Sequence, residues 1–209
     1  MSNEENFANA IKKLRETKEK KNFDQTIDLI VNLKGFDVRR EAFNTFIQLP
    51  NKVKNKRIAA FLEKESKAVD TIKKDDFPRY KEKKDIKKLI KKYDFFIASA
   101  KLMPAIATSF GRFLGPVGKM PSPQLGILPS EEEPVIKAVI EKINSNVRVR
   151  VKEPSIKIGI GKESLTDEQI MRNAITVYAK LIELLPRKND NIRNIKIKST
   201  MGKPINVQL

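Results

Sequence analysis

The sequence contains neither cysteine nor histidine among its 209 residues. Without cysteine it forms no disulfide and offers no thiolate nucleophile, and without histidine it lacks the imidazole general base and the usual zinc ligand sets. Most familiar catalytic constellations are thereby excluded, so we expect no catalytic site, no bound metal and no cofactor. The lack of cysteine fits a reducing cytosol without proving it, because many secreted proteins also lack disulfides.

Long apolar runs are missing as well. The first stretch, MSNEENFANAIKKLRETKEKK, is charged from position 4 onward and has none of the apolar core of a signal peptide. No later stretch approaches the roughly 18 apolar residues that a membrane span needs. We therefore expect a soluble, cytoplasmic protein with no membrane partner.

Basic residues, by contrast, are abundant. Lys+Arg number 43 against 26 Asp+Glu, which gives a formal net charge of +17. Such a field favours polyanions, and nucleic acid is the commonest polyanion of a cytosol. A halotolerant surface or a lysine-rich composition suited to heat would give the same balance, so the charge favours nucleic acid without settling the matter.

The first fifty residues show one helical and two strand patterns. Apolar residues at helical spacing predict an N-terminal helix that ends near Lys21: Phe7, Ala10, Ile11 and Leu14. The stretch FDQTIDLIVNLKG alternates apolar and polar residues and predicts a half-buried strand. A second strand is predicted in AFNTFIQLP.

The pattern changes after about residue 55. RIAAFLE and YDFFIASA are apolar runs without polar alternation, which is typical of strands buried on both faces of a parallel α/β sheet. We expect helices around Lys64 to Lys74, over the lysine-rich stretch Lys81 to Lys92, and over EEEPVIKAVIEKINSN. Between the last two, KLMPAIATSFGRFLGPVGKMPSPQLGILPS begins as an apolar helix and breaks into a loop rich in proline and glycine.

Alternation returns from Val147 onward. VRVRVK, SIKIGIG, NIRNIKIKS and INVQL predict strands, and TDEQIMRNAITVYAKLIELL predicts a capped helix. The two ends of the chain thus resemble each other in style and differ from the middle. This arrangement favours a discontinuous α+β domain built from residues 1–54 and 147–209, with residues 55–146 inserted as an α/β domain.

Basic side chains gather on single faces of the predicted strands. Arg148, Arg150 and Lys152 share one face of their strand, and Lys196 and Lys198 share one face of theirs. Such a face can follow a phosphate backbone, although basic residues also cover many sheets that face solvent. We favour RNA or DNA contact because the total charge agrees with it.

The turn STMG, from Ser199 to Gly202, has two interpretations. Met201 either packs against a sugar or base of bound nucleic acid, or it is tucked into the protein's own core. The residues alone favour the core, and likewise Phe23 at a strand start is more often a core residue than a stacking platform.

Nucleotide-binding motifs are poorly matched. GIGK at Gly159 to Lys162 lacks the spacing and the hydroxyl residue of a phosphate-binding loop, and GRFLGPVG is not a dinucleotide fingerprint. An enzyme that binds a nucleotide near Gly111 to Gly118 remains the alternative hypothesis to a nucleic-acid-binding protein.

Several stretches together resemble the L-one family of large-subunit ribosomal proteins, in its archaeal form. They occur in the family's order and cover nearly the whole chain: FDQTIDLIVNL, GRFLGPVGKMPSP, IGKESLTDEQIMRNA and STMGKP. The resemblance implies a discontinuous RNA-binding α+β domain and an inserted Rossmann-like, three-layer α/β domain. It also implies rRNA-binding positions at Phe23, Thr26, Thr200, Met201 and Gly202, to which we add the basic residues Lys198 and Lys162.

The resemblance further implies a function. The protein is expected to be a non-enzymatic, ribosome-associated constituent of the large subunit, bound to large-subunit rRNA at the mobile stalk and monomeric when free. It is also expected to assist release of exit-site tRNA through a loop with Arg112 and Lys119, and to repress translation of its own mRNA. In GPVGKMP, Val117 and Lys119 depart from a commoner bacterial pattern that has arginine and leucine. A free repressor that never joins ribosomes is a third possibility.

Overall fold

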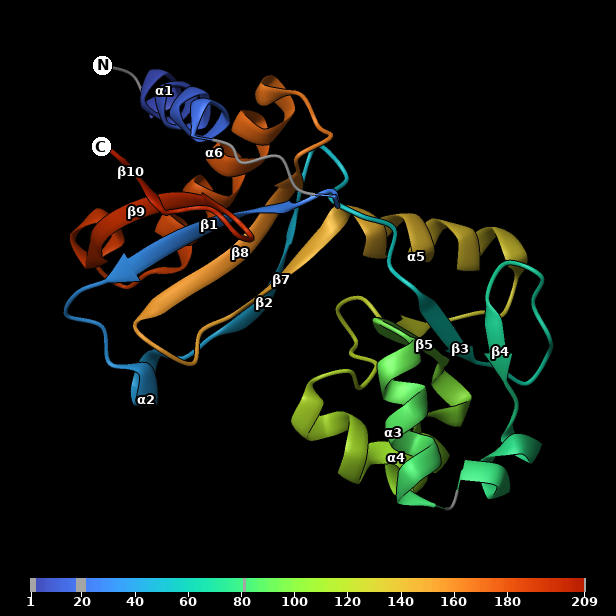
Figure 1. The fold of residues 1–209 in the computed structure, drawn as a ribbon. Helices are drawn as coiled ribbons and strands as arrows, with labels where there is room; N and C mark the ends of the chain where they lie inside the picture. Colours follow the sequence, from blue (N-terminus) through green and yellow to red (C-terminus); the bar gives the residue numbers. More distant parts are fainter. Residues whose placement is uncertain (1–2, 18–21, 81, 209) are drawn as a thin grey trace. The chain divides into compact units, whose positions relative to one another are not determined.

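A computed structural model describes residues 3–17, 22–80 and 82–208 of the chain. The chain divides into two compact units, of which unit 1 combines Met1–Lys54 with Ser145–Leu209 and unit 2 is Asn55–Asn144 (Figure 1). The second boundary lies two residues before the one expected from the sequence, next to the strand that begins at Asn146. The predicted mixture of helix and sheet in both parts is confirmed.

The main sheet of unit 1 has four antiparallel strands in the order β10-β9-β1-β8. Their bounds are β1 Thr26–Leu33, β8 Ser155–Lys162, β9 Ile192–Ser199 and β10 Ile205–Val207. Side chains along β1 alternate strictly between half-buried and buried, as the sequence alternation predicted. One face of this sheet therefore belongs to the core and the other carries the polar residues.

Two helices cover the core face of the sheet, namely α1 (Asn3–Glu16) and α6 (Asp167–Leu184) (Figure 1). Phe7 of α1 and Leu29 of β1 are completely buried in the shared core, and the Phe7 ring lies edge-on to Tyr178 at 5.9 Å. Thr166 starts α6 with a capping box, because its hydroxyl accepts from the backbone N–H of Gln169 and the Gln169 side chain accepts in return. The predicted cap is thus confirmed.

A separate two-stranded ribbon pairs β2 (Asn44–Gln48) with β7 (Asn146–Arg150). Arg148 on β7 lies over the ring of Phe46 at 5.9 Å and donates to Asn44. Burial and the nearby Arg150 lower the pKa of the Arg148 guanidinium from its usual value. The remaining short elements of unit 1 are α2 (Val38–Glu41) and the 3-10 helix η3 (Lys188–Asn191).

Unit 2 is built on four parallel strands in the order β4-β3-β5-β6. The strands are β3 Ile58–Phe61, β4 Asp70–Ile72, β5 Phe95–Ser99 and β6 Ile127–Leu128. Helices α3 (Lys83–Lys92) and α4 (Met103–Val117) pack on one face of the sheet, and α5 (Glu133–Ser145) packs on the other. Successive residues of β3 contribute to different apolar clusters, so the three-layer arrangement is confirmed.

Two expectations for unit 2 were wrong, namely the helix around Lys64 to Lys74 and the loop that contains Arg112. Residues 64–74 do not form a helix but include the strand β4 and the start of the 3-10 helix η1 (Lys74–Tyr80). A three-residue edge strand is too short to show a period, and its β-branched pair Thr71 and Ile72 favours extension. The GRFLGPV stretch lies inside α4, which is preceded by the 3-10 helix η2 (Ala100–Leu102) and ends at Gly118 in the left-handed conformation, with φ 73°.

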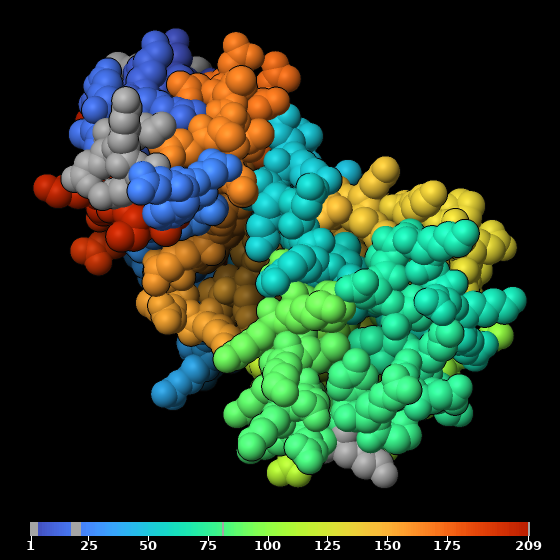
Figure 2. Space-filling view, turned by 45° about the vertical axis from the view of Figure 1, so that its right-hand side comes forward, coloured from blue at the N-terminus to red at the C-terminus, as the bar shows by residue number. Residues whose placement is uncertain are grey.

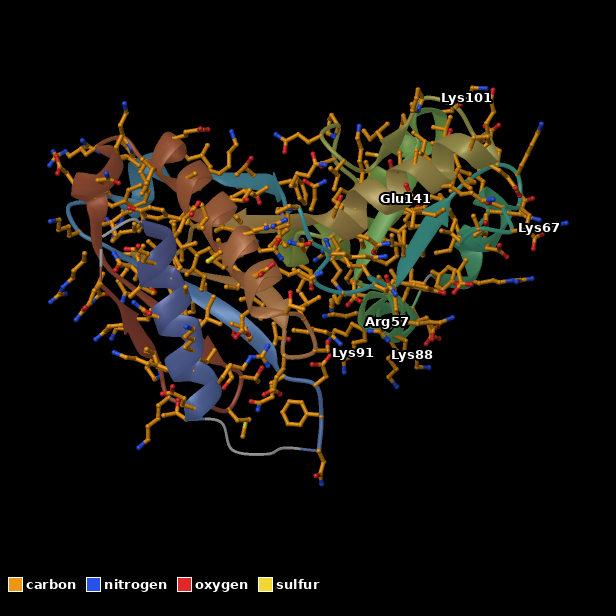
Figure 3. The ribbon with its side chains drawn as sticks, turned by 90° about the horizontal axis from the view of Figure 1, so that it is seen from above. Arg57, Lys67, Lys88, Lys91, Lys101 and Glu141 are labelled. Atoms are coloured by element: carbon orange, nitrogen blue, oxygen red, sulfur yellow. The ribbon has the colours of Figure 1, made fainter. Side chains whose placement is uncertain are left out.

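Helix α3 presents its polar side at the surface of unit 2, in bright green in Figure 2. Ile86 and Leu89 are buried beneath it, while Lys88 and Lys91 are exposed and extend outward close to Arg57 (Figure 3). The helix is therefore amphipathic, as the lysine-rich stretch indicated. Across the described ranges of the chain, no helix combines the length and apolar character that crossing a bilayer requires.

Candidate nucleic-acid interface

The turn after β9 is fastened to the start of β1. Thr200 donates its backbone N–H to the Thr26 carbonyl at 3.0 Å. Its side-chain Oγ1 donates to the same carbonyl and accepts from the Thr26 N–H, both at 3.1 Å. A hydroxyl has one proton and two lone pairs, so one acceptor site of Thr200 stays available for a ligand. These hydrogen bonds join two threonines that are 174 residues apart in the sequence.

The apolar side chains at this turn face solvent. Met201 is 65% exposed and Phe23 is 52% exposed, although both are large and hydrophobic. They belong to neighbouring segments, because the Met201 N–H donates at 3.1 Å to the side chain of Gln25, two residues after Phe23. The interpretations that tucked Met201 and Phe23 into the core are therefore wrong. Exposed apolar residues beside polar surface are typical of a binding site.

Gly202 completes the turn by donating its N–H to the Ser199 carbonyl at 3.1 Å. A Cβ atom at this position would run into the Ser199 hydroxyl. A side chain here therefore requires Ser199 to move, and it would also stand beside Met201. The glycine keeps both the turn and the approach to it open.

Basic side chains continue from the turn along the open sheet face. Lys198 on β9 lies opposite Asp28 on β1, and Lys196 lies opposite Ile30. Both lysines are half-buried on the face that α1 and α6 leave uncovered, as their alternation predicted. Burial raises the pKa of Asp28, an effect that the Lys198 charge partly opposes. On this part of the face, two cations thus lie beside a carboxyl whose pKa is raised.

Lys162 lies at the end of β8, opposite Thr26. Its ammonium pairs with Asp24 at 3.2 Å, and Asp24 also accepts from the N–H and hydroxyl of Ser164. Burial alone would raise the pKa of Asp24, but these hydrogen bonds and the lysine charge outweigh it and lower the pKa. The contacts hold the residue next to Phe23 in place.

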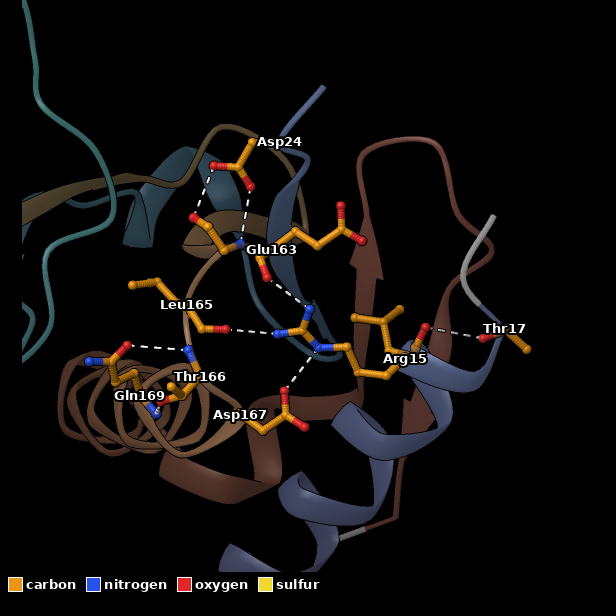
Figure 4. A network of polar contacts seen from close by, with 10 residues as sticks. Arg15, Thr17, Asp24, Glu163, Leu165, Thr166, Asp167 and Gln169 are labelled. Carbon is orange, nitrogen blue, oxygen red and sulfur yellow. Dashed lines mark hydrogen bonds and ion pairs between the residues drawn. The ribbon is translucent and has the colours of Figure 1, made fainter. Parts of the chain in front are cut away.

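Arg15 at the end of α1 binds the same loop through its guanidinium (Figure 4). Its guanidinium donates to the carbonyls of Glu163 and Leu165 at 2.8 Å each and pairs with Asp167 at 2.9 Å. Sequence reasoning missed Arg15, Asp24 and Gln25 as supports of the site. Only the capping box that starts α6 marked this loop as ordered.

Arg112 and Lys119 belong to unit 2, whereas the residues of this cluster belong to unit 1. Arg112 lies within α4 rather than in a loop, which corrects the expectation. Lys119 donates to the carbonyls of Ile90 and Tyr93 at 2.7 Å each, where α3 ends. Two of its three protons are therefore engaged in holding that helix end.

The alternative nucleotide site finds little support in unit 2. Gly111 and Gly115 lie inside α4 and form no phosphate-binding loop. Ligands of open parallel sheets bind beyond the carboxyl ends of the strands. There the Glu131 carboxylate accepts from the N–H groups of Glu63 and Lys64 at 3.1 Å, after the end of β3. Burial would raise the pKa of Glu131, but these N–H groups, Ser99 and Lys101 lower it overall.

A polar hollow of about 810 Å³ in unit 2 opens at the opposite end of the sheet, before β3 and β5 begin. Tyr93 and Asp70 line it and are hydrogen-bonded to each other at 2.5 Å. Within residues 3–17, 22–80 and 82–208, no cluster of three or more acidic side chains is placed to hold a metal ion. The described residues therefore favour the exposed turn and open sheet face of unit 1 as the functional site.

Comparison with known proteins agrees with a nucleic-acid-associated role. Residues 14–203 match the model of a family described as "Ribosomal protein L1p/L10e family". The chain is 38% identical over 207 residues to "Large ribosomal subunit protein uL1" of Nanoarchaeum equitans, which covers 94% of this chain and 97% of that protein. It is 34% identical to the protein of the same name from Picrophilus torridus, with 96% of each chain covered. The corresponding protein of Cenarchaeum symbiosum is 32% identical, over 97% of this chain and 95% of its own.

Proposed function

Because the chain belongs to the ribosomal protein L1p/L10e family, and is thus a structural, non-enzymatic protein of the large ribosomal subunit with archaeal relatives, we propose that unit 1 binds large-subunit rRNA at the mobile stalk. The contact lies on the turn Ser199–Gly202, on Phe23 and Thr26, and on the basic residues Lys162 and Lys198. The protein then resides in the cytoplasm on the ribosome.

One observation carries this proposal. Two of the four large hydrophobic side chains that are exposed among the described residues, Phe23 and Met201, belong to segments joined by the bond between Met201 and Gln25, at the end of a basic, uncovered sheet face. A folded RNA presents sugars and base faces that cover apolar groups, and phosphates that attract the lysines beside them. Such a surface recognises the shape and the backbone of the RNA rather than its base sequence.

The test compares matched exposed residues. Phe23→Ala should weaken binding of a large-subunit rRNA stalk fragment by roughly tenfold to a hundredfold, because a base stacked on an aromatic ring contributes about 1–3 kcal/mol. Met201→Ala should have an effect of similar size, because covering a large apolar side chain contributes about 1.5–3 kcal/mol. Leu184→Ala is the control, since Leu184 is also a large exposed hydrophobic residue of unit 1, at the end of α6. Fluorescence anisotropy at moderate salt measures the affinities. Equal affinities for all three variants would refute the site.

Two further activities belong to the proposal. The same surface binds a mimic of the ribosomal site on the protein's own mRNA and so represses its translation. One surface serves both RNAs if Met201→Ala weakens both in the same proportion. Sedimentation with ribosomes distinguishes this protein from a free repressor, because the chain then appears in the large-subunit fraction.

Assistance in release of exit-site tRNA is assigned to the surface of α4 and the loop after it. Arg112 is exposed on α4 and is the residue that can reach a phosphate, while Lys119 keeps its position by its two carbonyl bonds. Arg112→Gln should slow tRNA departure from ribosomes reconstituted with the variant and leave assembly into the subunit intact. Unchanged departure rates would remove Arg112 from the proposal.

A further inference from the structure

Four lysines form one stripe along the outer side of α3. Lys84, Lys87, Lys88 and Lys91 follow one another at spacings of three, one and three residues, and all four are exposed. Since an α-helix has 3.6 residues per turn, these positions share one face and span roughly 10 Å. The opposite side of the helix is buried in the core of unit 2 through Ile86 and Leu89.

Part of this stripe destabilises the helix that carries it. Like charges three or four residues apart repel one another, and the helix dipole disfavours Lys84 in the first turn, although it favours Lys91 in the last turn. The residue before the helix, Glu82, makes no side-chain cap bond. Lys88 pairs with Asp85 at 3.4 Å, but Lys84, Lys87 and Lys91 have no ion-pair partner in the part of the chain that the structure describes. Residues that destabilise the helix in which they lie are expected at functional sites, so these lysines point to an external ligand.

Arg57 extends the stripe beyond the end of the helix. Its guanidinium donates to the Lys91 carbonyl at 3.3 Å, and its side chain remains 63% exposed despite an ion pair with Asp94 at 3.7 Å. Figure 3 shows Arg57, Lys88 and Lys91 gathered on one side of unit 2. We call the four lysines and Arg57 the α3 stripe.

We infer that the α3 stripe is a second RNA-binding surface, which takes the phosphate backbone of double-stranded RNA without regard to sequence. Lysines supply point charges that suit phosphates, and the stripe holds no aromatic ring on which an unpaired base could stack. Its apolar side is already buried, so the helix cannot insert into a bilayer as amphipathic membrane helices do. Lysine is also depleted in protein–protein interfaces.

The inference is independent of the surface proposed on unit 1, because it needs no contact by Phe23 or Met201. The stripe variant replaces Lys84, Lys87, Lys88 and Lys91 by glutamine in the full chain. The control variant replaces four other exposed lysines of unit 2 by glutamine and so removes the same charge: Lys64, Lys67, Lys74 and Lys137. Glutamine and lysine have similar helix propensities, so both variants should keep the wild-type circular dichroism spectrum.

The first readout is the salt dependence of binding to an RNA duplex of arbitrary sequence. If the four lysines contact phosphates, the slope of log K against log salt becomes shallower by about 3.6 in the stripe variant, and by less than about 1 in the control variant. Equal changes in the two variants would mean that net charge alone matters, which overturns the inference. Displacement of the duplex by an acidic protein or peptide of equal charge, at the same salt concentration, would also overturn the inference.

The second readout is lysine acetylation followed by mass spectrometry of the wild-type protein. Bound duplex should slow acetylation at Lys84, Lys87 and Lys91 severalfold and leave Lys64 and Lys137 unchanged. Acetylation of the stripe at the same rate with and without duplex overturns the inference. If Phe23→Ala loses binding to the stalk fragment but keeps the wild-type salt slope for the duplex, the two surfaces are separate sites. If Phe23→Ala keeps its stalk-fragment affinity while the stripe variant shows a shallower salt slope for the duplex, only the unit 1 proposal is refuted.

Discussion

Unit 1 and unit 2 both pack helices on a four-stranded sheet, but they cover their sheets differently. In unit 1, α1 and α6 lie on one face, and the other face carries half-buried polar residues such as Asp28 and Lys198. In unit 2, α3 and α4 cover one face and α5 covers the other. A sheet with a bare face offers a broad surface to a ligand. A sheet enclosed on both faces leaves only its strand ends and the outer sides of its helices.

This difference assigns different kinds of contact to the two units. Unit 1 can place backbone turns, apolar side chains and cations together on one surface, as it does around Met201. The apolar residues of unit 2 are buried in two internal clusters, and its helices present charged outer sides to solvent. We therefore propose shape-specific recognition for unit 1 and general electrostatic attraction for unit 2.

The largest expected effect comes from opening the enclosed core. Phe61→Ala should lower the free energy of unfolding of unit 2 by about 3–5 kcal/mol, because truncating a buried aromatic residue leaves a cavity. The Phe61 ring is fully buried and lies 5.7 Å from Phe96 and 5.3 Å from Phe110 between ring centroids. Urea unfolding followed by hydrogen exchange resolves the two units. Ile30→Ala, on the bare face of unit 1, is the control and should cost much less; a loss of protection in both units together would break the comparison.

Removing the anchor of unit 1 should have the next largest effect. Arg15→Ala strands the carbonyls of Glu163 and Leu165 and breaks the pair with Asp167, which should cost unit 1 about 1–3 kcal/mol. Arg15→Lys retains the charge but cannot reach all three acceptors, so an intermediate loss is expected. The same unfolding measurement should show no change in unit 2. A shift confined to unit 2 would contradict this assignment.

One carboxyl in unit 2 should stabilise it more at neutral pH than in acid. The pKa of Glu131 lies below its ordinary value of 4.5, so the stability it contributes is present above that value and is lost as the pH falls through the lowered pKa. Glu131→Ala also frees the N–H groups of Glu63 and Lys64, and we expect a cost of about 1 kcal/mol at neutral pH. Unfolding of unit 2 in a pH series measures both. An equally steep acid loss in wild type and variant would remove Glu131 as its source.

The corresponding carboxyl of unit 1 should behave in the opposite sense. Burial raises the pKa of Asp28, so its ionised form costs stability at neutral pH, and the cost disappears as the pH falls through the raised pKa. Asp28→Asn should therefore stabilise unit 1 and strengthen RNA binding, each by less than about 1 kcal/mol, since the attraction between Asp28 and the Lys198 charge is worth little at a surface. Asn32→Ala on the same strand face is the control for side-chain loss. Weaker RNA binding by Asp28→Asn would show that the carboxyl positions Lys198.

Periodic segments of the fold could be predicted because burial imposes their period. The alternation of β1 and β9 and the capping box of α6 appear in the residues themselves, and each of these elements lies where the sequence indicated. Strand β4 could not be predicted, since three residues at a sheet edge show no period and its lysine-rich surroundings suit helix and loop alike.

The candidate site was predictable only in part. The bare basic face follows from alternation, but neither the exposure of Met201 nor that of Phe23 does, and the residues alone favoured burial for both. The supports of the site were missed for a different reason. Arg15 meets its carbonyl partners across about 150 positions of sequence, and such a bond leaves no local pattern in either segment.

The pairing of β1 has a consequence for synthesis of the chain. Both neighbours of this central strand, β8 and β9, follow the whole of unit 2 in the sequence. At typical elongation rates of about 5–20 residues per second, the emerging strand waits of order ten seconds before its last neighbour leaves the ribosome. Unit 2, whose parts are consecutive, is complete well before then. The nascent N-terminal segment is therefore the portion of this polypeptide most in need of a chaperone.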